Sequence, residues 1–268
     1  MSAAAHTVSA ERRGRASSPS PTLLLLLAVI ACAWAFAAWV ELSGAAAGLH
    51  HHALFHAVAN QSLPLWTAVI QLAGAWQFMT AAMMLPSSLP MISLYTITAR
   101  RAPAWRRSLS LFVVAYFAVW TAFAIPAFIG DMGLHGLVHA SPWLDQHARL
   151  IPAATFGLAA AWQLTPLKDA CLRECRHPAA FLQRYYRRGR RAGLLLGLRH
   201  GLFCLGCCWA LMLVMFAAGV AHLAWMGALG LVMVAEKTFP GGDRLARPLG
   251  AAFAVLAVAA VVVPIPGI

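Results

Sequence analysis

The uncharged, apolar run at residues 201–235 constrains the fold more than any other feature. It contains no Lys, Arg, Asp or Glu. As one straight helix these residues would extend over about 52 Å, because an α-helix rises about 1.5 Å per residue. The hydrocarbon core of a bilayer is only about 30 Å thick. The sequence therefore predicts a membrane-buried hairpin of two helices over residues 197–237, with its turn near 219–222.

The composition is that of a membrane protein throughout. Of the 268 residues, 61% are hydrophobic and 10% are charged, whereas soluble domains average about 25% charged residues. We predict an all-α, polytopic transmembrane bundle over residues 22–268. Residues 1–21 are rich in Ser, Ala and Arg and are expected to form a disordered cytoplasmic tail, with a signal peptide as the alternative. Charge-free length predicts about seven spans, near 22–42, 64–85, 108–130, 149–167, 194–219, 222–238 and 248–266.

The distribution of positive charge predicts the orientation of the bundle. If the N-terminus lies inside the cell, 19 of the 20 Lys and Arg residues fall on inner segments, and only Arg149 falls outside. Cytoplasmic loops of membrane proteins carry such an excess of Lys and Arg. The sequence thus predicts an N-in/C-out bundle. Because topology explains the formal net charge of +12, we expect the lipid bilayer as a partner and do not expect nucleic acid.

The predicted fifth span carries a cluster of residues that bind soft metals. His200, Cys204, Cys207 and Cys208 stand at i, i+4, i+7 and i+8, so they share one face of a helix. His, thiolate and thioether groups suit Cu(I), and His with thiolate also suits zinc. Arg199 is the nearby positive charge expected to promote deprotonation of these thiols. The alternative is that the cysteines are small packing residues of an apolar helix.

The predicted second span ends in a methionine-rich stretch, with Met79, Met83 and Met84 before Pro86. This span runs from outside to inside and the fifth runs from inside to outside. The methionines and the cysteine cluster are therefore expected at the same cytoplasmic depth. Thioethers can add weaker ligands to a soft metal, although buried methionines at helical spacing also fit core packing. Pro86 is expected to break the helix and to free backbone carbonyl groups.

Two more features lie on the predicted inner side. Glu236 ends the sixth span, and we interpret it either as an ion-pair partner of Lys237 or Arg199, or as a metal ligand, proton acceptor or gate. Cys171 and Cys175 are one helical turn apart in the inner loop. They are either a station that receives or passes on a metal at the membrane face, or ordinary cytoplasmic thiols.

The predicted outer loops, 43–63 and 131–148, are rich in histidine. The first contains four histidines. In the second, His135 and His139 form an i, i+4 pair that begins one turn after Asp131. Such pairs can chelate Cu(II) or zinc, and solvated loop histidines are the alternative.

Four stretches of the chain resemble a known family. They are MTAAMMLPSSLP (79–90), QLTPLKDACLRECRHP (163–178), GLRHGLFCLGCCWALMLVMFAAGV (197–220) and WMGALGLVMVAEK (225–237). The chain resembles, over about residues 64–245, a family of bacterial integral membrane proteins catalogued as predicted metal-binding and associated with copper delivery to tyrosinase-type oxidases. The resemblance implies metal handling. The motif residues of that family correspond to Met83, Met84, Pro86, Lys168, Cys171, His200, Cys204, Cys207, Cys208 and Glu236.

We therefore predict a bacterial inner-membrane protein that binds Cu(I) and delivers it to a copper-oxidase client, a membrane copper chaperone and not an enzyme. Zinc, or no metal, is the alternative to copper. A scaffold or accessory subunit of an oxidase is the alternative function, followed by a passive metal transporter or an intramembrane enzyme. The sequence makes no prediction of the oligomeric state. The predicted metal ligands are Cys204, Cys207, Cys208, His200, Met79, Met83, Met84, Cys171, Cys175 and Glu236.

Overall fold

The computed structural model describes residues 21–44, 60–187, 191–218 and 222–262. Within these ranges the chain is all-helical and contains no β-strand, which confirms the predicted all-α class. The elements are α2 (Pro21–Leu42), α5 (Leu65–Ala99), α6 (Trp105–Ala140), α7 (Pro142–Gln146), α8 (Leu150–Gln163), α9 (Pro166–Arg176), α10 (Pro178–Tyr185), α11 (Ala192–Ala218), α12 (Leu223–Thr238), the 3-10 helix η1 (Gly242–Leu245) and α13 (Ala246–Val262).

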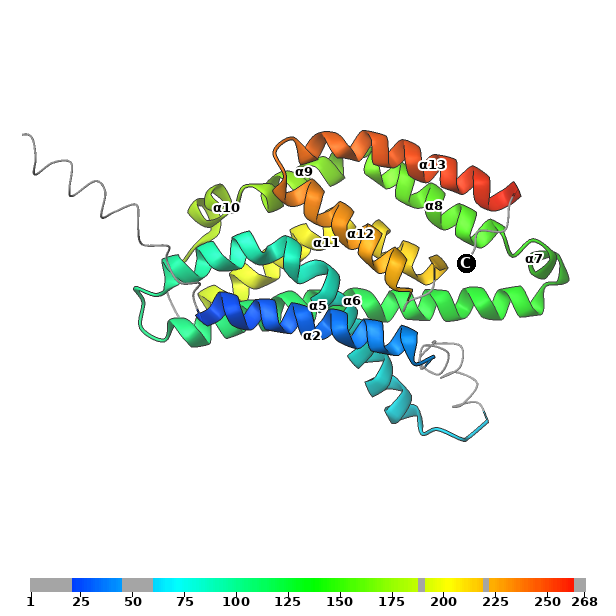
Figure 1. Cartoon of the computed structure of the whole chain (residues 1–268), viewed down its shortest axis with the longest axis horizontal. Helices are drawn as coiled ribbons and strands as arrows, with labels where there is room; N and C mark the ends of the chain where they lie inside the picture. Colours follow the sequence, from blue (N-terminus) through cyan, green and yellow to red (C-terminus); the bar gives the residue numbers. More distant parts are fainter. Residues whose placement is uncertain (1–20, 45–59, 188–190, 219–221, 263–268) are drawn as a thin grey trace, which may run out of the picture.

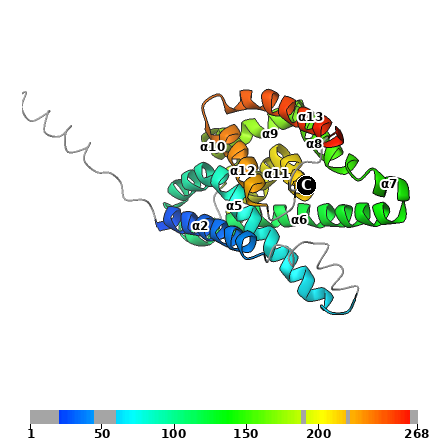
Figure 2. The ribbon, with the colours of Figure 1, turned by 45° about the vertical axis from the view of Figure 1, so that its right-hand side comes forward.

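Helix α11 lies at the centre of the bundle, as the views in Figures 1 and 2 agree, and it contacts α6, α8, α9 and α12. Its close approach to α6 depends on glycine. A β-carbon at Gly193 would overlap the backbone of Ser108, and one at Gly197 would overlap the backbone of Phe112. Small residues at four-residue spacing allow two apolar helices to pack backbone to backbone. The glycines therefore fix how α11, which carries the cysteine cluster, lies against α6.

The remaining helices surround this central pair. Helix α5 packs against α6, and α2 and α12 pack against α5. Helices α8 and α13 lie side by side along the opposite edge of the bundle (Figure 1). The short helices α9 and α10 join α8 to α11, and α9 contacts both α11 and α12. The cysteines of α9 and α11 and the end of α12 are thereby brought to one end of the core.

Helix α5 does not break at Pro86, as the sequence suggested, but continues through Pro86 and Pro90 to Ala99. Proline lacks the N–H that would bond to the carbonyl four residues earlier, which here belongs to Ala82. The indole Nε1 of Trp34 on α2 donates a hydrogen bond to that carbonyl at 3.1 Å. A side chain from a neighbouring helix thus satisfies the freed backbone group, and the helix can continue.

Each predicted span coincides with a helix in the described ranges, but not all of these helices are long. Among the residues that the structure describes, five helical segments are long and apolar enough to cross a membrane: those containing α2, α5, α6, α11 and α13. Helices α8 and α9 form a pair bent by 68° that would count as a sixth if it is one broken span. Helix α12 has only 16 residues. The number of seven spans and the N-in/C-out orientation remain predictions.

Of the segments predicted to lie outside the spans, the structure describes residues 131–148 but not the N-terminal tail before Pro21 or the histidine-rich stretch 50–56. The segment 131–148, expected to be a loop, is mostly helical, because α6 runs on to Ala140 and α7 follows at once. Asp131 and His135 therefore lie on α6. The predicted tail, apart from Pro21, and the histidines between 50 and 56 lie outside the described residues.

Candidate metal centre

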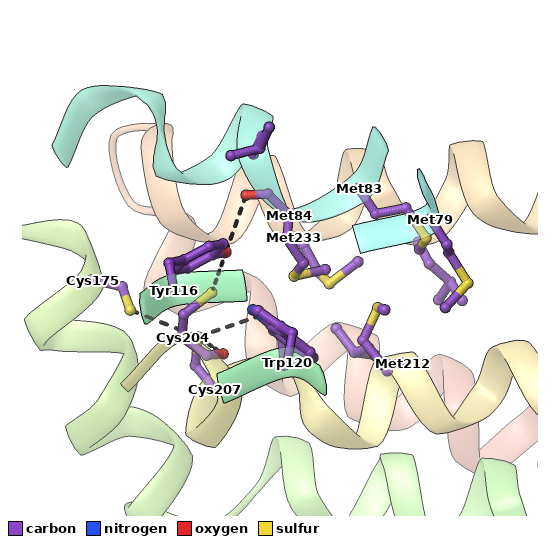
Figure 3. Packing of buried hydrophobic residues seen from close by; sticks show 14 of the residues in the cluster. Met79, Met83, Met84, Tyr116, Trp120, Cys175, Cys204, Cys207, Met212 and Met233 are labelled. Atoms are coloured by element: carbon purple, nitrogen blue, oxygen red, sulfur yellow. Dashed lines mark hydrogen bonds between the residues drawn. The ribbon is translucent and has the colours of Figure 1, made fainter. Parts of the chain in front are cut away.

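The sulfur of Cys204 sits in a polar cage inside the apolar core. The side chain is fully buried. The ammonium group of Lys237 on α12 donates a hydrogen bond to Cys204 Sγ at 3.0 Å and another to Ser87 Oγ on α5 at 3.0 Å. The hydroxyl of Tyr116 on α6 lies 3.1 Å from the same sulfur and accepts a hydrogen bond from Ser88. Polar groups from α12 and α6 therefore contact one thiol of α11, and two serines of α5 hold those groups in place. Figure 3 shows the contact between Tyr116 and Cys204.

Three further cysteines lie around this cage. Cys207 Sγ is 3.4 Å from Cys208 Sγ and 3.9 Å from Cys175 Sγ, and its thiol donates to the carbonyl of Cys204 at 3.2 Å. Cys207 and Cys208 are fully buried, and Cys175 is nearly so. The sequence predicts Cys175 in the inner loop, apart from the fifth span. The structure instead brings it into the core against α11 (Figure 3).

Cys171 lies next to this group but contributes less to it. Its side chain is partly exposed, and its sulfur lies 2.5 Å from the position that a β-carbon of Gly206 would occupy. Glycine at position 206 therefore makes room for Cys171 against α11. The two cysteines of α9 thus differ, with Cys175 in the buried group and Cys171 at its edge.

His200 is buried one turn before Cys204, but its contacts are with rings and a hydroxyl. Its Nε2 lies 3.3 Å from Ser88 Oγ. The ring stacks against Phe112 and against Tyr116, with centroid distances of 5.8 and 5.6 Å. Its Nδ1 is buried and has no hydrogen-bond partner in the described part of the chain. The histidine is linked to Cys204 through Ser88 and Tyr116, since both hydroxyls belong to one hydrogen-bonded chain.

Glu236 pairs with Lys168, a partner that its sequence position does not predict. Both carboxylate oxygens accept hydrogen bonds from the ammonium group of Lys168 on α9, each at 2.8 Å, and Oε1 also accepts one from Gln163 on α8 at 3.0 Å. Lys168 and Glu236 are both fully buried. The expected pairing of Glu236 with Lys237 or Arg199 is therefore wrong. A buried ion pair is tolerated when the remaining lone pairs are satisfied, and here Gln163 satisfies one of them.

The positive charge near the cysteines also differs from expectation. Arg199, predicted to serve the thiols, places its guanidinium over the ring of Tyr185, 4.8 Å from the ring centroid. Lys237 is the cation that contacts Cys204. The sequence offered a signal for it, because an ionisable residue at the end of an apolar span is a candidate functional group. No sequence signal identified Tyr116.

The predicted methionines are in the same core as the cysteines. Met79, Met83 and Met84 are buried, and Figure 3 shows Met84 beside Met233 of α12, close to the cysteine group. Among the described residues, however, no three or more His, Cys, Asp or Glu side chains are arranged to hold a metal ion. The cysteines instead hydrogen-bond to one another and to Lys237. The cysteine sulfurs that could bind a metal thus take part in hydrogen bonds in this structure.

Comparison with known proteins identifies a family. A family described as copper chaperone, PpoB2, matches residues 73–260, which is most of the chain. No curated protein and no solved structure matches it. The matched range includes every predicted ligand and the whole polar cage. The chain therefore belongs to the PpoB2 copper chaperone family, in agreement with the resemblance noted in its sequence.

Proposed function

From its membership of a copper chaperone family we propose that this protein is a membrane copper chaperone that binds Cu(I) in the core of its helix bundle. One observation carries the proposal: four cysteines from two helices, Cys204, Cys207, Cys208 and Cys175, gather at a buried position beside the methionines of α5 and α12. Cu(I) is a soft ion that prefers thiolate and thioether ligands. This concentration of sulfur is the chemistry that Cu(I) selects.

In the proposed complex Cys204, Cys207 and Cys208 bind the ion as thiolates, with His200, Met79, Met83 and Met84 as weaker ligands. Cysteine binds metal as the thiolate. Lys237 supplies a positive charge beside Cys204 in the metal-free protein. When the cation binds, it replaces Lys237 as the partner of this sulfur. The ammonium group keeps Ser87 as a hydrogen-bond acceptor.

The cysteines of α9 have a separate role in this proposal. Cys175 lies 3.9 Å from Cys207, and Cys171 is partly exposed at the edge of the same group. A ligand exchange from Cys171 to Cys175 and on to Cys207 would carry the ion from the surface into the core. Glu236 supports this end of the bundle through Lys168, because their ion pair joins α12 to α9.

The proposed setting is the inner membrane of a bacterial cell. We assign seven spans with the N-terminus inside, with α12 and the bent pair α8–α9 as spans in addition to the five long ones. The cysteine group then lies in the cytoplasmic half, and the recipient is a copper oxidase outside the cytoplasm. The protein itself transfers an ion between ligands and performs no chemical conversion.

A metal-free scaffold for an oxidase is the second candidate. It is favoured by the hydrogen bonds that the cysteines make with one another and with Lys237. Cysteines in a purely structural core that binds no metal would also be hydrogen-bonded in this way. Copper binding distinguishes the two functions.

The test is to titrate the purified full-length protein with Cu(I) under reducing conditions and to count the bound ions. The wild-type protein should bind at least one Cu(I) tightly. The triple variant C204S/C207S/C208S should lose this binding, because serine hydroxyls are hard, weak ligands for a soft ion. Cys32→Ser is the matched control, since Cys32 is an exposed cysteine of α2, and it should bind like the wild type. Full binding by the triple variant, or none by the wild type, refutes the proposed site.

A further inference from the structure

The bundle core contains far more methionine than the cysteine site uses. Of the ten methionines in the sequence, eight are buried members of one hydrophobic cluster. They are Met79, Met83, Met84, Met91, Met212, Met215, Met226 and Met233. The same cluster contains Cys175, Cys204, Cys207 and Cys208. The thioethers are therefore part of the core into which the thiols project.

On α11 the sulfur residues form a stripe along the helix. Cys204, Cys208, Met212 and Met215 stand at i, i+4, i+8 and i+11, and all four are fully buried. Residues at these spacings share one face of a helix. At about 1.5 Å per residue the stripe extends about 16 Å beyond Cys204.

The corresponding face of α12 runs in the opposite direction along the same column. Lys237, Met233, Gly230 and Met226 succeed one another at intervals of four, three and four residues. Lys237 is bonded to Cys204 at one end. Further along, a β-carbon at Gly230 would lie 3.8 Å from Met83 Cγ on α5. Gly230 therefore brings α12 against Met83 at the middle of the column.

Side-chain contacts of α5 and α6 fix the two ends. Ser87 and Ser88 of α5 belong to the cage around Cys204. Trp76 lies three turns earlier and meets Phe128 and Phe216, with ring centroids 5.6 and 5.9 Å apart. Figure 3 shows the order between them, with Met84 and Met233 next to the cysteines and Met79, Met83 and Met212 beyond.

Phe216 also borders a pocket of about 650 Å³ that is lined by Asp131 and His135 of α6. The Nδ1 of His135 lies 2.8 Å from the backbone carbonyl of Asp131. A carbonyl oxygen only accepts, so Nδ1 carries the hydrogen, and in the neutral imidazole Nε2 carries the lone pair. A histidine held in this way by a backbone carbonyl has the orientation typical of a metal ligand. The column thus leads from thiols at one end to an imidazole and a carboxylate at the other.

We propose that the buried thioethers form a relay that binds Cu(I) in transit between the cysteine group and the pocket at Asp131 and His135. The proposal rests on the proposed function. Thioethers are neutral and bind Cu(I) more weakly than thiolates do, so an ion can pass from one to the next by ligand exchange. No bond other than metal–ligand bonds is made or broken, and copper remains Cu(I) throughout.

The test compares variants that keep the size of the side chain. Met212→Leu with Met215→Leu removes the two thioethers of the α11 stripe beyond the cysteines, neither of which is a proposed ligand of the cysteine site, and leucine for methionine is a well tolerated exchange in cores. Met91→Leu is the matched control, because Met91 is equally buried but lies on α5 beyond Ser88, outside the column. Full-length proteins are reconstituted into liposomes that enclose a chromogenic Cu(I) chelator, and Cu(I) is added outside under reducing conditions.

We expect the wild type and M91L to transfer copper to the enclosed chelator at the same rate. The double variant should be slower by about tenfold or more, the scale on which metal sites respond to loss of a contributing group, while a parallel titration shows that it still binds Cu(I) at the cysteines. Transfer by the double variant at the wild-type rate, equal slowing by M91L, or bound copper that the wild type does not transfer overturns the relay alone. Absence of any copper binding by the wild type overturns the proposed function as well.

Discussion

At the scale of single residues, the buried charges determine which substitutions the core tolerates. Lys168 and Lys237 each meet one acidic or sulfur group, Glu236 and Cys204, at 3.0 Å or less. Removing one partner of a buried pair leaves an uncompensated charge, whereas replacing both partners by apolar groups is often nearly neutral. The two lysines differ, because only Lys237 contacts a proposed metal ligand. A substitution of Lys168 therefore tests how much the buried ion pair stabilises the fold, without changing a group that contacts a proposed metal ligand.

Lys168→Met should destabilise the protein by about 3–5 kcal/mol, because Glu236 would lose the ammonium group that bonds both of its oxygens. The double variant K168M/E236L should recover most of this loss. The measurement is unfolding of the detergent-solubilised protein followed by tryptophan fluorescence. A single variant as stable as the wild type would show that the pair does not stabilise the junction of α9 with α12.

At the scale of helices, packing depends on a few positions where two backbones meet. A β-carbon at Gly197 would lie 2.8 Å from Phe112 Cα, whereas one at Gly157 in α8 would meet nothing within 4 Å. Position 197 cannot accept a side chain unless α6 and α11 separate. Position 157 has room for one.

Gly197→Ala should therefore cost about 1–3 kcal/mol of stability, the usual effect of overpacking. Gly157→Ala is the control and should be neutral or stabilising by about 0.5–1 kcal/mol, because alanine is the better helix former. Thermal unfolding of both variants under identical conditions measures the difference. If the two alanine variants melted together, the close contact of α6 with α11 would be refuted.

Sequence patterns predicted helices more reliably than their ends or their neighbours. The uncharged run 201–235 indicated α11 and α12, and helical spacing placed Cys204 and Cys208 on one face. The continuation of α5 through Pro86 was not predictable, because it depends on a hydrogen bond from Trp34, which is 48 positions from its acceptor Ala82. Contacts of this kind arise only when the helices assemble.

The same reason explains what was missed in the candidate site. The cysteine group was expected from spacing within α11, and the structure adds Cys175 from 32 positions away. Lys237 and Tyr116 reach Cys204 from two other helices. Spacing along one helix identifies residues that share a face, but it does not identify what the neighbouring helices place against that face.

At the scale of the whole molecule, the basic residues predict the orientation in the membrane. With seven spans and the N-terminus inside, the C-terminus lies outside the cytoplasm. Alkaline phosphatase fused after residue 268 should therefore be active, because this enzyme needs an oxidising compartment for its disulfides. The same enzyme fused after residue 190, in the Arg-rich inner segment, should be inactive. The reverse pattern would contradict both the orientation and the number of spans.

The central claim is that copper binds to sulfur in the core of this bundle. The most direct measurement is the copper K-edge X-ray absorption spectrum of the full-length protein loaded with one equivalent of Cu(I). The first shell should be dominated by sulfur, and C207S should lose sulfur scattering while C32S should not, because Cys207 lies between Cys208 and Cys175. A first shell of nitrogen and oxygen only, unchanged in C207S, would contradict the account.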